Sequence, residues 1–167
     1  MAIDYDDEAR QHVARLLADL SRPEAYPFAV DAVDIEETHI SIVFLAGDLV
    51  FKVKKPVDFG FLDFTTLERR HHFCQEEVRL NRRLTRDVYL GVVPVVEVGG
   101  QLQFYGDGPV VEYAVKMRRL PDDRMLLRML GRGEVDERVL VALADRLTRF
   151  YREEAATGPG VDEWGTP

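Results

Sequence analysis

Apolar and polar positions change their period along the chain, and each change predicts a new element. Residues 7–20 carry apolar side chains at helical spacing and end at a Ser-Arg-Pro sequence that stops the helix. From residue 33 the pattern becomes that of strands. Three segments predict a meander, with a Gly-Asp turn between the last two: residues 33–37, 40–46 and 49–54.

A long helix and a second set of strands follow. Thr65 starts the helix, which runs to about residue 86, and Glu68 stands three residues later as in a capping box. A Gly-Gly hairpin turn and a continuous apolar segment then predict three more strands: residues 92–98, 102–105 and 110–117.

Helical spacing returns near the end of the chain, over residues 122–130 and from 135 to about 155. The order of the elements predicts an α+β fold, with an antiparallel sheet of about five strands and one long helix packed against it. We expect a first domain over residues 1–117, a second part over 118–157, and an irregular tail over 158–167.

The composition is that of an ordinary globular protein. Of the 167 residues, 46% are hydrophobic and 31% are charged. No apolar run approaches the ~18 residues of a membrane span, and the acidic N-terminus does not resemble a signal peptide. The single cysteine, Cys74, cannot form an internal disulfide, and the Cys/His spacing offers no zinc site. A cytoplasmic location is therefore expected.

The net charge of -8 argues against a general nucleic-acid binder, but the charge is unevenly distributed. Residues 1–48 carry three Lys/Arg against eleven Asp/Glu, whereas residues 52–86 carry nine against five. A basic segment inside an acidic protein suits a local anionic ligand better than a long polyanion. A solvated helix face rich in arginine explains the same segment equally well.

Lys52 stands in the middle of the third predicted strand. Side chains alternate along a strand, so Lys52 and Lys54 point to one face together with Val50. The other face carries Leu49, Phe51 and Val53. An ammonium group held over a sheet surface can bind a phosphate. A lysine that protects an edge strand from aggregation is the alternative, and the strand alone leaves both explanations open.

The long helix supplies a partner for this lysine. One stripe of the helix is predicted to face the core: Phe73, Glu77, Leu80 and Leu84. A carboxylate in an apolar row needs a cation, because an unpaired buried charge costs about 3–5 kcal/mol. Lys52 is the natural partner of Glu77, and protein kinases use such a pair to hold a lysine against ATP phosphates. A glutamate that bends toward solvent is the alternative.

Two short motifs are discounted. Residues 58–60 spell Asp-Phe-Gly, the metal-binding tripeptide of kinases, but they precede the glutamate helix, whereas the functional tripeptide follows the catalytic loop. His71 and His72 are adjacent, so they cannot bind one metal as an i,i+4 pair does. We expect both histidines on the surface.

The turn between the first two strands is the nearest substitute for a glycine-rich loop. No GxGxxG occurs, and residues 38–41 read Thr-His-Ile-Ser. Hydroxyls and backbone amides in such a turn can hold a phosphate without glycine. An ordinary polar turn is the alternative.

Three segments of the chain carry the motifs of a known family: EETHISIVFLAGDLVFKVKKPVDFGFLDFTTLERRHHFCQEEVRLNRRL, YLGVVPV and VVEYAVKMRRLPDDRML. They resemble the N-terminal portion of the bacterial aminoglycoside-phosphotransferase-like proteins, a kinase-like family. In some members this domain is joined to a P-loop ATPase domain. The resemblance covers residues 33–155.

The resemblance implies a protein-kinase-like small lobe in the first domain, followed by the hinge and first helices of an incomplete large lobe. It implies ATP as the ligand, with magnesium bound to the ATP. Lys52 is then the phosphate lysine and Glu77 its helix partner, with Lys54 and Glu76 as the nearest alternatives. Two further groups are implied: Thr38, His39 and Ser41 as the nucleotide-positioning turn, and Lys116, Met117 and Arg118 as the hinge whose backbone meets adenine.

The catalytic part of such kinases is not recognisable in the sequence. A loop of the form HGDLH, with an asparagine and a second aspartate for magnesium, is absent, and Phe150-Tyr151 stands where relatives commonly have Phe-His. We therefore predict no catalytic and no metal-ligating residue. The expected function is the ATP-binding portion of a small-molecule kinase that is truncated and inactive alone, with its acceptor substrate unassigned.

The last predicted helix, residues 135–155, carries a broad apolar stripe. It can fold back on the sheet, dock a second chain, form a homodimer or stay exposed. The alternative function is therefore a non-catalytic kinase-lobe scaffold that docks a partner protein through this helix. Neither a nucleic acid nor a membrane is expected as a partner.

Overall fold

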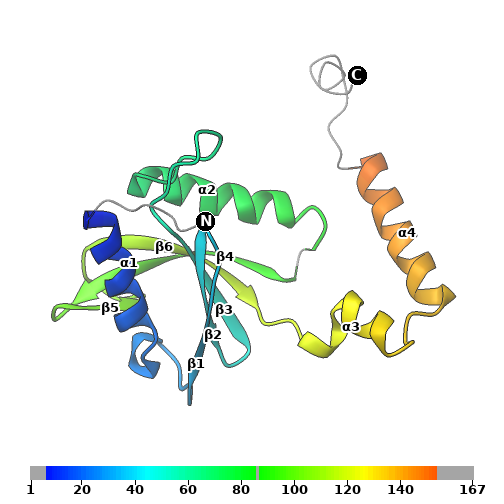
Figure 1. The fold of residues 1–167 in the computed structure, drawn as a ribbon, viewed down its shortest axis with the longest axis horizontal. Coiled ribbons are helices and arrows are strands. Elements are labelled where there is room, and N and C mark those ends of the chain that lie inside the picture. The colour runs from blue at the N-terminus through cyan, green and yellow to red at the C-terminus, as the bar shows by residue number, and fades with distance from the viewer. Residues whose placement is uncertain (1–6, 86, 154–167) are drawn as a thin grey trace. The chain divides into compact units, whose positions relative to one another are not determined.

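The computed structural model describes residues 7–85 and 87–153, and these form an α+β protein (Figure 1). The chain divides into two compact units, Met1–Arg119 and Leu120–Pro167. The first unit ends at Arg119, two residues after the expected end of the first domain at residue 117. The irregular tail predicted over 158–167 and the predicted end of the last helix, 154–155, lie outside the described residues.

The first unit is built on a curled antiparallel sheet, whose order is β1-β2-β3-β6-β4-β5. The described residues contain six strands, one for each of the six segments predicted, although the sheet itself was expected to hold about five: β1 (Val33–Glu37), β2 (Ser41–Ala46), β3 (Leu49–Lys54), β4 (Tyr89–Val98), β5 (Gln101–Phe104) and β6 (Val110–Arg118). The first and third strands match the sequence prediction residue for residue. The order places β3 and β6 in the interior of the sheet, so their side chains have strands on both sides.

Helix α1 (Asp7–Leu20) and the short 3-10 turn η1 (Pro23–Ala25) cover one face of the sheet. Leu16 and Leu20 of α1 are fully buried there, each contributing about 1.5–3 kcal/mol of burial free energy. Phe51 and Phe104 form the centre of the core, with ring centroids 4.4 Å apart. This face therefore carries the main hydrophobic core.

Helix α2 (Leu67–Asn81) covers part of the opposite face, over β6 and β4 (Figure 1). Its N-cap is Thr66, one residue after the predicted Thr65, and the hydroxyl of Thr66 accepts the backbone amide of Arg69. Glu68 is therefore not the third residue of a capping box. The helix also ends earlier than predicted, where the guanidinium of Arg82 donates to the carbonyl of Tyr89 at the start of β4.

The predicted buried stripe of this helix is wrong in its phase. The helix buries a row with four-residue spacing: Arg70, Cys74 and Val78. Leu80 and Leu84, which were predicted to face the core, are 43% and 37% exposed. The apolar pattern misplaced the row because an arginine occupies one of its positions, and that arginine is buried only through a charged partner on β6.

The second unit contains a 3-10 turn η2 (Asp122–Arg124) and the helices α3 (Leu126–Gly131) and α4 (Glu137–Glu153). The single helix predicted over 122–130 is thus divided in two. None of the described residues of α3 and α4 is buried, and Leu140, Leu143 and Leu147 are all more than 40% exposed. Among the described residues, no helix is both long and apolar enough to cross a membrane.

Candidate functional site

Glu77 of α2 binds two lysines of β3 at the same time. The ammonium of Lys52 lies 2.8 Å from Oε1 of Glu77, and the ammonium of Lys54 lies 2.7 Å from Oε2. The lysines stand two residues apart on one strand, so they point to the same face and one carboxylate reaches both. The predicted pairing of Lys52 with Glu77 is confirmed, and Lys54 shares the same carboxylate.

The position of Lys52 excludes one of the explanations that the sequence left open. Strand β3 lies between β2 and β6, so Lys52 does not protect an edge strand. Its side chain is 27% exposed, and its ammonium is therefore accessible to a ligand. Glu76, the alternative carboxylate, is bound instead to Arg79 of the same helix at 2.7 Å.

The protonation of Glu77 is decided by its two lysines. Burial raises the pKa of the Glu77 carboxyl, but the charge of Lys54 and the hydrogen bonds from Lys52 and Lys54 act in the opposite direction. The attractive interactions dominate, so the pKa lies below its usual value and Glu77 is ionised at neutral pH. The three groups then carry a net charge of +1, which favours a bound anion.

An apolar surface continues from Lys52 across three strands. The register places Val43 of β2 opposite Lys52, and Leu45 and Met117 on either side of Val50. Val50 is buried, and the other three apolar side chains are half-buried. An ammonium group at the end of an apolar surface suits a ligand with one flat apolar end and one anionic end.

The turn before β2 is closed by its own hydrogen bonds. The hydroxyl of Thr38 accepts the backbone amides of Ile40 and Ser41, at 3.3 and 3.0 Å. Two of the amides that were candidates for holding a phosphate therefore already have a partner. His39 is exposed. The turn is consequently an ordered polar turn in which Thr38 already occupies these two amides.

Ser41 differs from the rest of this turn. The register places it opposite Lys54, so its side chain lies on the same face as the two lysines. The residue is fully buried, and its hydroxyl has no hydrogen-bond partner among the residues that the structure describes. A buried unpaired hydroxyl costs about 1–3 kcal/mol, and such orphan groups require an explanation.

Lys55 was not predicted as part of this region. Its ammonium donates to Glu37 at 2.8 Å and to the carbonyl of Thr38 at 2.9 Å, and its side chain is only 7% exposed. It therefore holds the turn against the end of β3. The sequence shows three lysines at the end of the third strand, Lys52, Lys54 and Lys55. It does not show which element each ammonium contacts, so the role of Lys55 could not be predicted.

The predicted hinge residues do not converge on the lysines. Lys116 points to the opposite face, where its ammonium donates to the hydroxyl of Tyr105 and lies 5.9 Å from the centroid of the Phe51 ring. Met117 lies beside Val50 on the lysine face. The backbone of residues 116–117 lies in β6, an interior strand that pairs with both β3 and β4, so strand pairing engages this backbone.

Arg118 ends β6, and its backbone is also engaged. Its amide donates to the carbonyl of Val88, and its guanidinium donates to the carbonyl of Asp87. The next amide, that of Arg119, donates to the carbonyl of Asp48. Of the three predicted hinge residues, only Met117 therefore has its side chain beside Val50 on the face that carries Lys52.

A second ionic cluster, which the sequence did not reveal, joins both helices to β6. Glu112 is fully buried, and one of its oxygens lies 2.7 Å from Nε of Arg70 and 3.0 Å from Nε2 of His12. Its other oxygen accepts the amide of Tyr113. Arg70 also donates to the carbonyl of Phe64. The members lie far apart in sequence, so no spacing motif could have found them.

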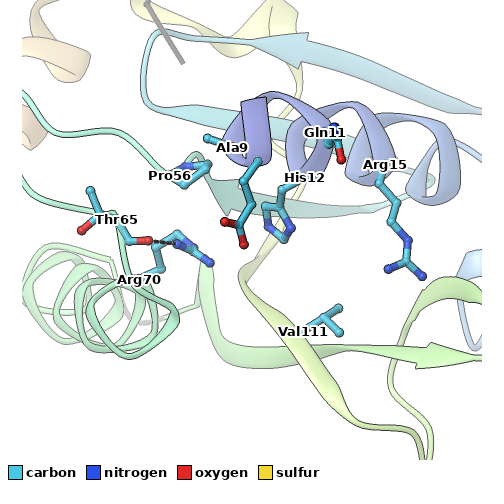
Figure 2. Close-up of a pocket in the computed structure, with 9 residues that line it drawn as sticks. Ala9, Gln11, His12, Arg15, Pro56, Thr65, Arg70 and Val111 are labelled. Atoms are coloured by element: carbon cyan, nitrogen blue, oxygen red, sulfur yellow. Dashed lines mark hydrogen bonds between the residues drawn. The ribbon is translucent and has the colours of Figure 1, made fainter. Parts of the chain in front are cut away.

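This cluster borders a cavity of about 520 Å³ (Figure 2). His12 and Arg15 of α1 and Arg70 of α2 line it together with the carboxylate of Glu8. The guanidinium of Arg15 is already bound to Glu97 at 2.9 Å. Neither Lys52 nor Glu77 lines this cavity, and its cations already have carboxylate partners within the protein.

The two discounted motifs have local structural roles. Residues 58–60 lie in a short loop, where the amide of Phe59 donates to the carbonyl of Leu62. His72 is exposed as predicted, but His71 stacks on the ring of Tyr113 with centroids 3.8 Å apart. In residues 7–85 and 87–153, no group of three or more His, Cys, Asp or Glu side chains could hold a metal ion.

The chain is similar to three mycobacterial proteins: the uncharacterized proteins Rv2004c and MT2060 of Mycobacterium tuberculosis and Mb2027c of Mycobacterium bovis. Each is 39% identical over 120 residues, which make up 72% of this chain and 22% of the relative. The chain thus spans about a fifth of the length of these curated relatives. No family model and no solved structure matches the chain.

Proposed function

We propose that the chain is the ATP-binding portion of an aminoglycoside-phosphotransferase-like small-molecule kinase. One observation carries this proposal: the accessible ammonium of Lys52, on an interior strand, is held by Glu77 of the helix packed on the same face. Kinases use such a strand lysine and helix glutamate to place an ammonium against ATP phosphates. The order of strands and helix in the first unit supports a kinase-like small lobe.

The surroundings of Lys52 suit the two ends of a nucleotide. The net charge of +1 on Lys52, Lys54 and Glu77 favours the phosphates, and the apolar surface beginning at Val43 offers a flat base a place to pack. The unpaired hydroxyl of Ser41 adds a donor near the same face.

The proposal concerns binding by this chain. A lysine can hold phosphates, but phosphoryl transfer also needs metal ions and a group that orients the attacking hydroxyl. The given sequence has no recognisable motif for either, so we expect Mg-ATP to bind without transfer to a small alcohol by this chain alone. Transfer by a longer protein that contains this portion is part of the same proposal.

Titration calorimetry with Mg-ATP tests the proposal. We expect wild type to bind, and Lys52→Met to bind at least about tenfold more weakly, a loss of about 1.4 kcal/mol. Lys116→Met is the matched control, because that lysine points to the other face of the same sheet; its affinity should stay within about twofold. Absence of Mg-ATP binding by the wild type would contradict the proposal, as would equal losses in both variants.

A second candidate function rests on the exposed side chains of α4. Leu140, Leu143, Leu147 and Tyr151 leave a row of apolar surface on this helix, and such surfaces commonly dock a partner. A non-catalytic scaffold of this kind does not need a nucleotide. Failure of Mg-ATP to raise the melting temperature of both wild type and Lys52→Met would favour this scaffold over the kinase portion.

A further inference from the structure

Lys55, the residue after β3, is bound to the turn that joins β1 and β2. Its ammonium donates to Oε2 of Glu37 at 2.8 Å and to the carbonyl of Thr38 at 2.9 Å. Its backbone amide donates to the carbonyl of Ile40 at 2.9 Å. The Lys55 side chain is only 7% exposed, so its ammonium makes these bonds largely away from water. One residue therefore holds the turn on both of its sides.

The ammonium of Lys55 holds the turn from the face opposite to Lys52. The register pairs Glu37 with Ile42, and Ile42 lies in the hydrophobic core that α1 covers. The bond to Glu37 places the ammonium of Lys55 on this core face. Lys52 and Lys54 point to the other face, where they bind Glu77. Lys55 thus fixes the turn without occupying the face on which a ligand would bind.

The turn lies in the direction that the phosphates of a nucleotide at Lys52 would take. On the face of Lys52, the register of β2 and β3 gives three successive pairs: Leu45 with Val50, Val43 with Lys52, and Ser41 with Lys54. Neighbouring pairs are about 7 Å apart. A base on the first, apolar pair and a phosphate at Lys52 leave the outer phosphates directed toward Ser41 and the turn before it.

His39 is the residue of this turn that can still bind a ligand. It is exposed, and its backbone amide has no hydrogen-bond partner among residues 7–85 and 87–153. The amides of Ile40 and Ser41 are already taken by the hydroxyl of Thr38. An imidazole and a backbone amide can both donate to phosphate oxygens. His39 is therefore the contact through which the turn can reach a phosphate.

We propose that Lys55 is a positioning residue, which fixes the β1–β2 turn so that His39 meets the outer phosphates of a nucleotide bound at Lys52. This inference rests on the proposed function, because it takes a nucleotide at Lys52 as given. The pair of Lys52 with Glu77 stays formed, since an ammonium has three donors and binds a carboxylate and a phosphate together. Lys55 itself does not touch the ligand.

Calorimetry with Mg-ATP and with AMP measures this role, because AMP lacks the outer phosphates. The AMP affinity is obtained by displacement of Mg-ATP. We expect Lys55→Met to bind Mg-ATP at least about fivefold more weakly than wild type, and AMP within about twofold. Lys116→Met is the matched control, because that lysine also lies on the core face but bonds to Tyr105. It should bind both ligands within about twofold of wild type.

Glu37→Ala separates positioning from a simple effect of charge. Loss of a cation at Lys55 weakens the binding of an anion through charge alone, whereas loss of an anion at Glu37 strengthens it. Positioning predicts the same sign for both variants, because both loosen the turn. We expect Glu37→Ala to bind Mg-ATP about threefold more weakly and AMP unchanged. Stronger or unchanged Mg-ATP binding by Glu37→Ala would contradict the proposal.

A double-mutant cycle tests whether Lys55 acts through His39. His39→Ala should weaken Mg-ATP binding at least about threefold, and K55M/H39A should lose no more than Lys55→Met alone. Additive losses would show that the two residues act independently, which overturns the proposal. Unchanged Mg-ATP binding by His39→Ala would overturn it as well.

Urea denaturation shows which variants fold. Where Lys55→Met does not fold, Glu37→Ala decides in its place, since the Glu37 side chain is 47% exposed and its removal leaves no buried gap. Equal losses of Mg-ATP and AMP binding in Lys55→Met would make Lys55 a part of the scaffold only and would leave the proposed function intact. A wild type that does not bind Mg-ATP would instead refute the proposed function, and this inference with it.

Discussion

Arg70 of α2 and Glu112 of β6 form a buried ion pair, with Nε of the arginine 2.7 Å from the carboxylate and side chains only 7% and 0% exposed. The pair fixes the first turns of α2 relative to the sheet. The same carboxylate contacts His12 of α1, so one anion ties both helices to the sheet. This anchor lies near the start of α2, the helix whose Glu77 binds Lys52 of β3.

Replacement of Glu112 by alanine should strongly destabilise the first unit. Arg70 would keep its charge in a buried site with only the backbone carbonyls of Phe64 and Thr65 as partners. We expect the free energy of unfolding to fall by about 3–5 kcal/mol, measured by urea denaturation. Glu97→Ala is the control, because its pair with Arg15 is partly exposed; its cost should be about 0–1 kcal/mol. Similar losses in both variants would show that Glu112 is not a buried anchor.

Ser41→Ala should have opposite effects on stability and on ligand binding. The serine hydroxyl is buried and has no partner among the described residues, so its removal should raise the free energy of unfolding by about 1 kcal/mol in the free protein. If a phosphate is the missing partner, the same change weakens Mg-ATP binding by several-fold. Urea denaturation and calorimetry on one preparation measure both. A destabilised variant with unchanged affinity would show that the hydroxyl has another role.

The contribution of Glu77 to stability should depend on pH. Its pKa in the folded protein lies below that of the unfolded chain, which is about 4.3. A lowered folded pKa adds stability that is fully present above the unfolded value and is lost as the pH falls through the folded value. The difference in unfolding free energy between wild type and Glu77→Gln should therefore be largest near neutral pH. It should shrink below about pH 4.

The other carboxylates titrate in both wild type and Glu77→Gln, so their contributions cancel from the difference in unfolding free energy between the two proteins. Glu76→Gln is the matched control, because Glu76 binds Arg79 on the exposed side of the same helix. A wild-type to Glu77→Gln difference that stays constant between neutral and acidic pH would show that folding does not lower the pKa of Glu77. A difference of the same size for Glu76 would show that burial is not the cause.

The sequence predicts the local elements of this protein better than it predicts which side chains are buried. The strands follow from period-two patterns. The pairing of Lys52 with Glu77 was predicted from the cost of an unpaired carboxylate in an apolar row, and the pair forms although α2 buries a different row. The phase of α2 could not be predicted, because Arg70 counts as exposed until Glu112 is known to lie beside it. Pairs between distant segments leave no periodic signal.

The remaining errors at the site have the same origin. The division of Glu77 between two lysines depends on the position of α2 over the sheet, which no local pattern encodes. The direction of Lys116, toward the face that carries Phe51, follows from strand alternation, but the resemblance directed attention to its backbone. The motifs selected the candidate residues, whereas the register of the strands gave the directions of their side chains.

Cys74 offers a direct measurement of how firmly α2 is packed on the sheet. The thiol is fully buried on the contact face, and burial raises its pKa to about 12. Because the thiolate is the reactive form, the native thiol should react with a disulfide reagent at pH 8 at least ~100-fold more slowly than in urea. It is the single cysteine of the chain, so the signal is unambiguous.

A control variant carries Gln75→Cys with Cys74→Ser, which moves the thiol to the exposed side of the helix, and it should react at the rate of a free thiol. Native Cys74 reacting as fast as this control would mean that α2 does not stay on the sheet, and the Lys52–Glu77 contact would then be transient.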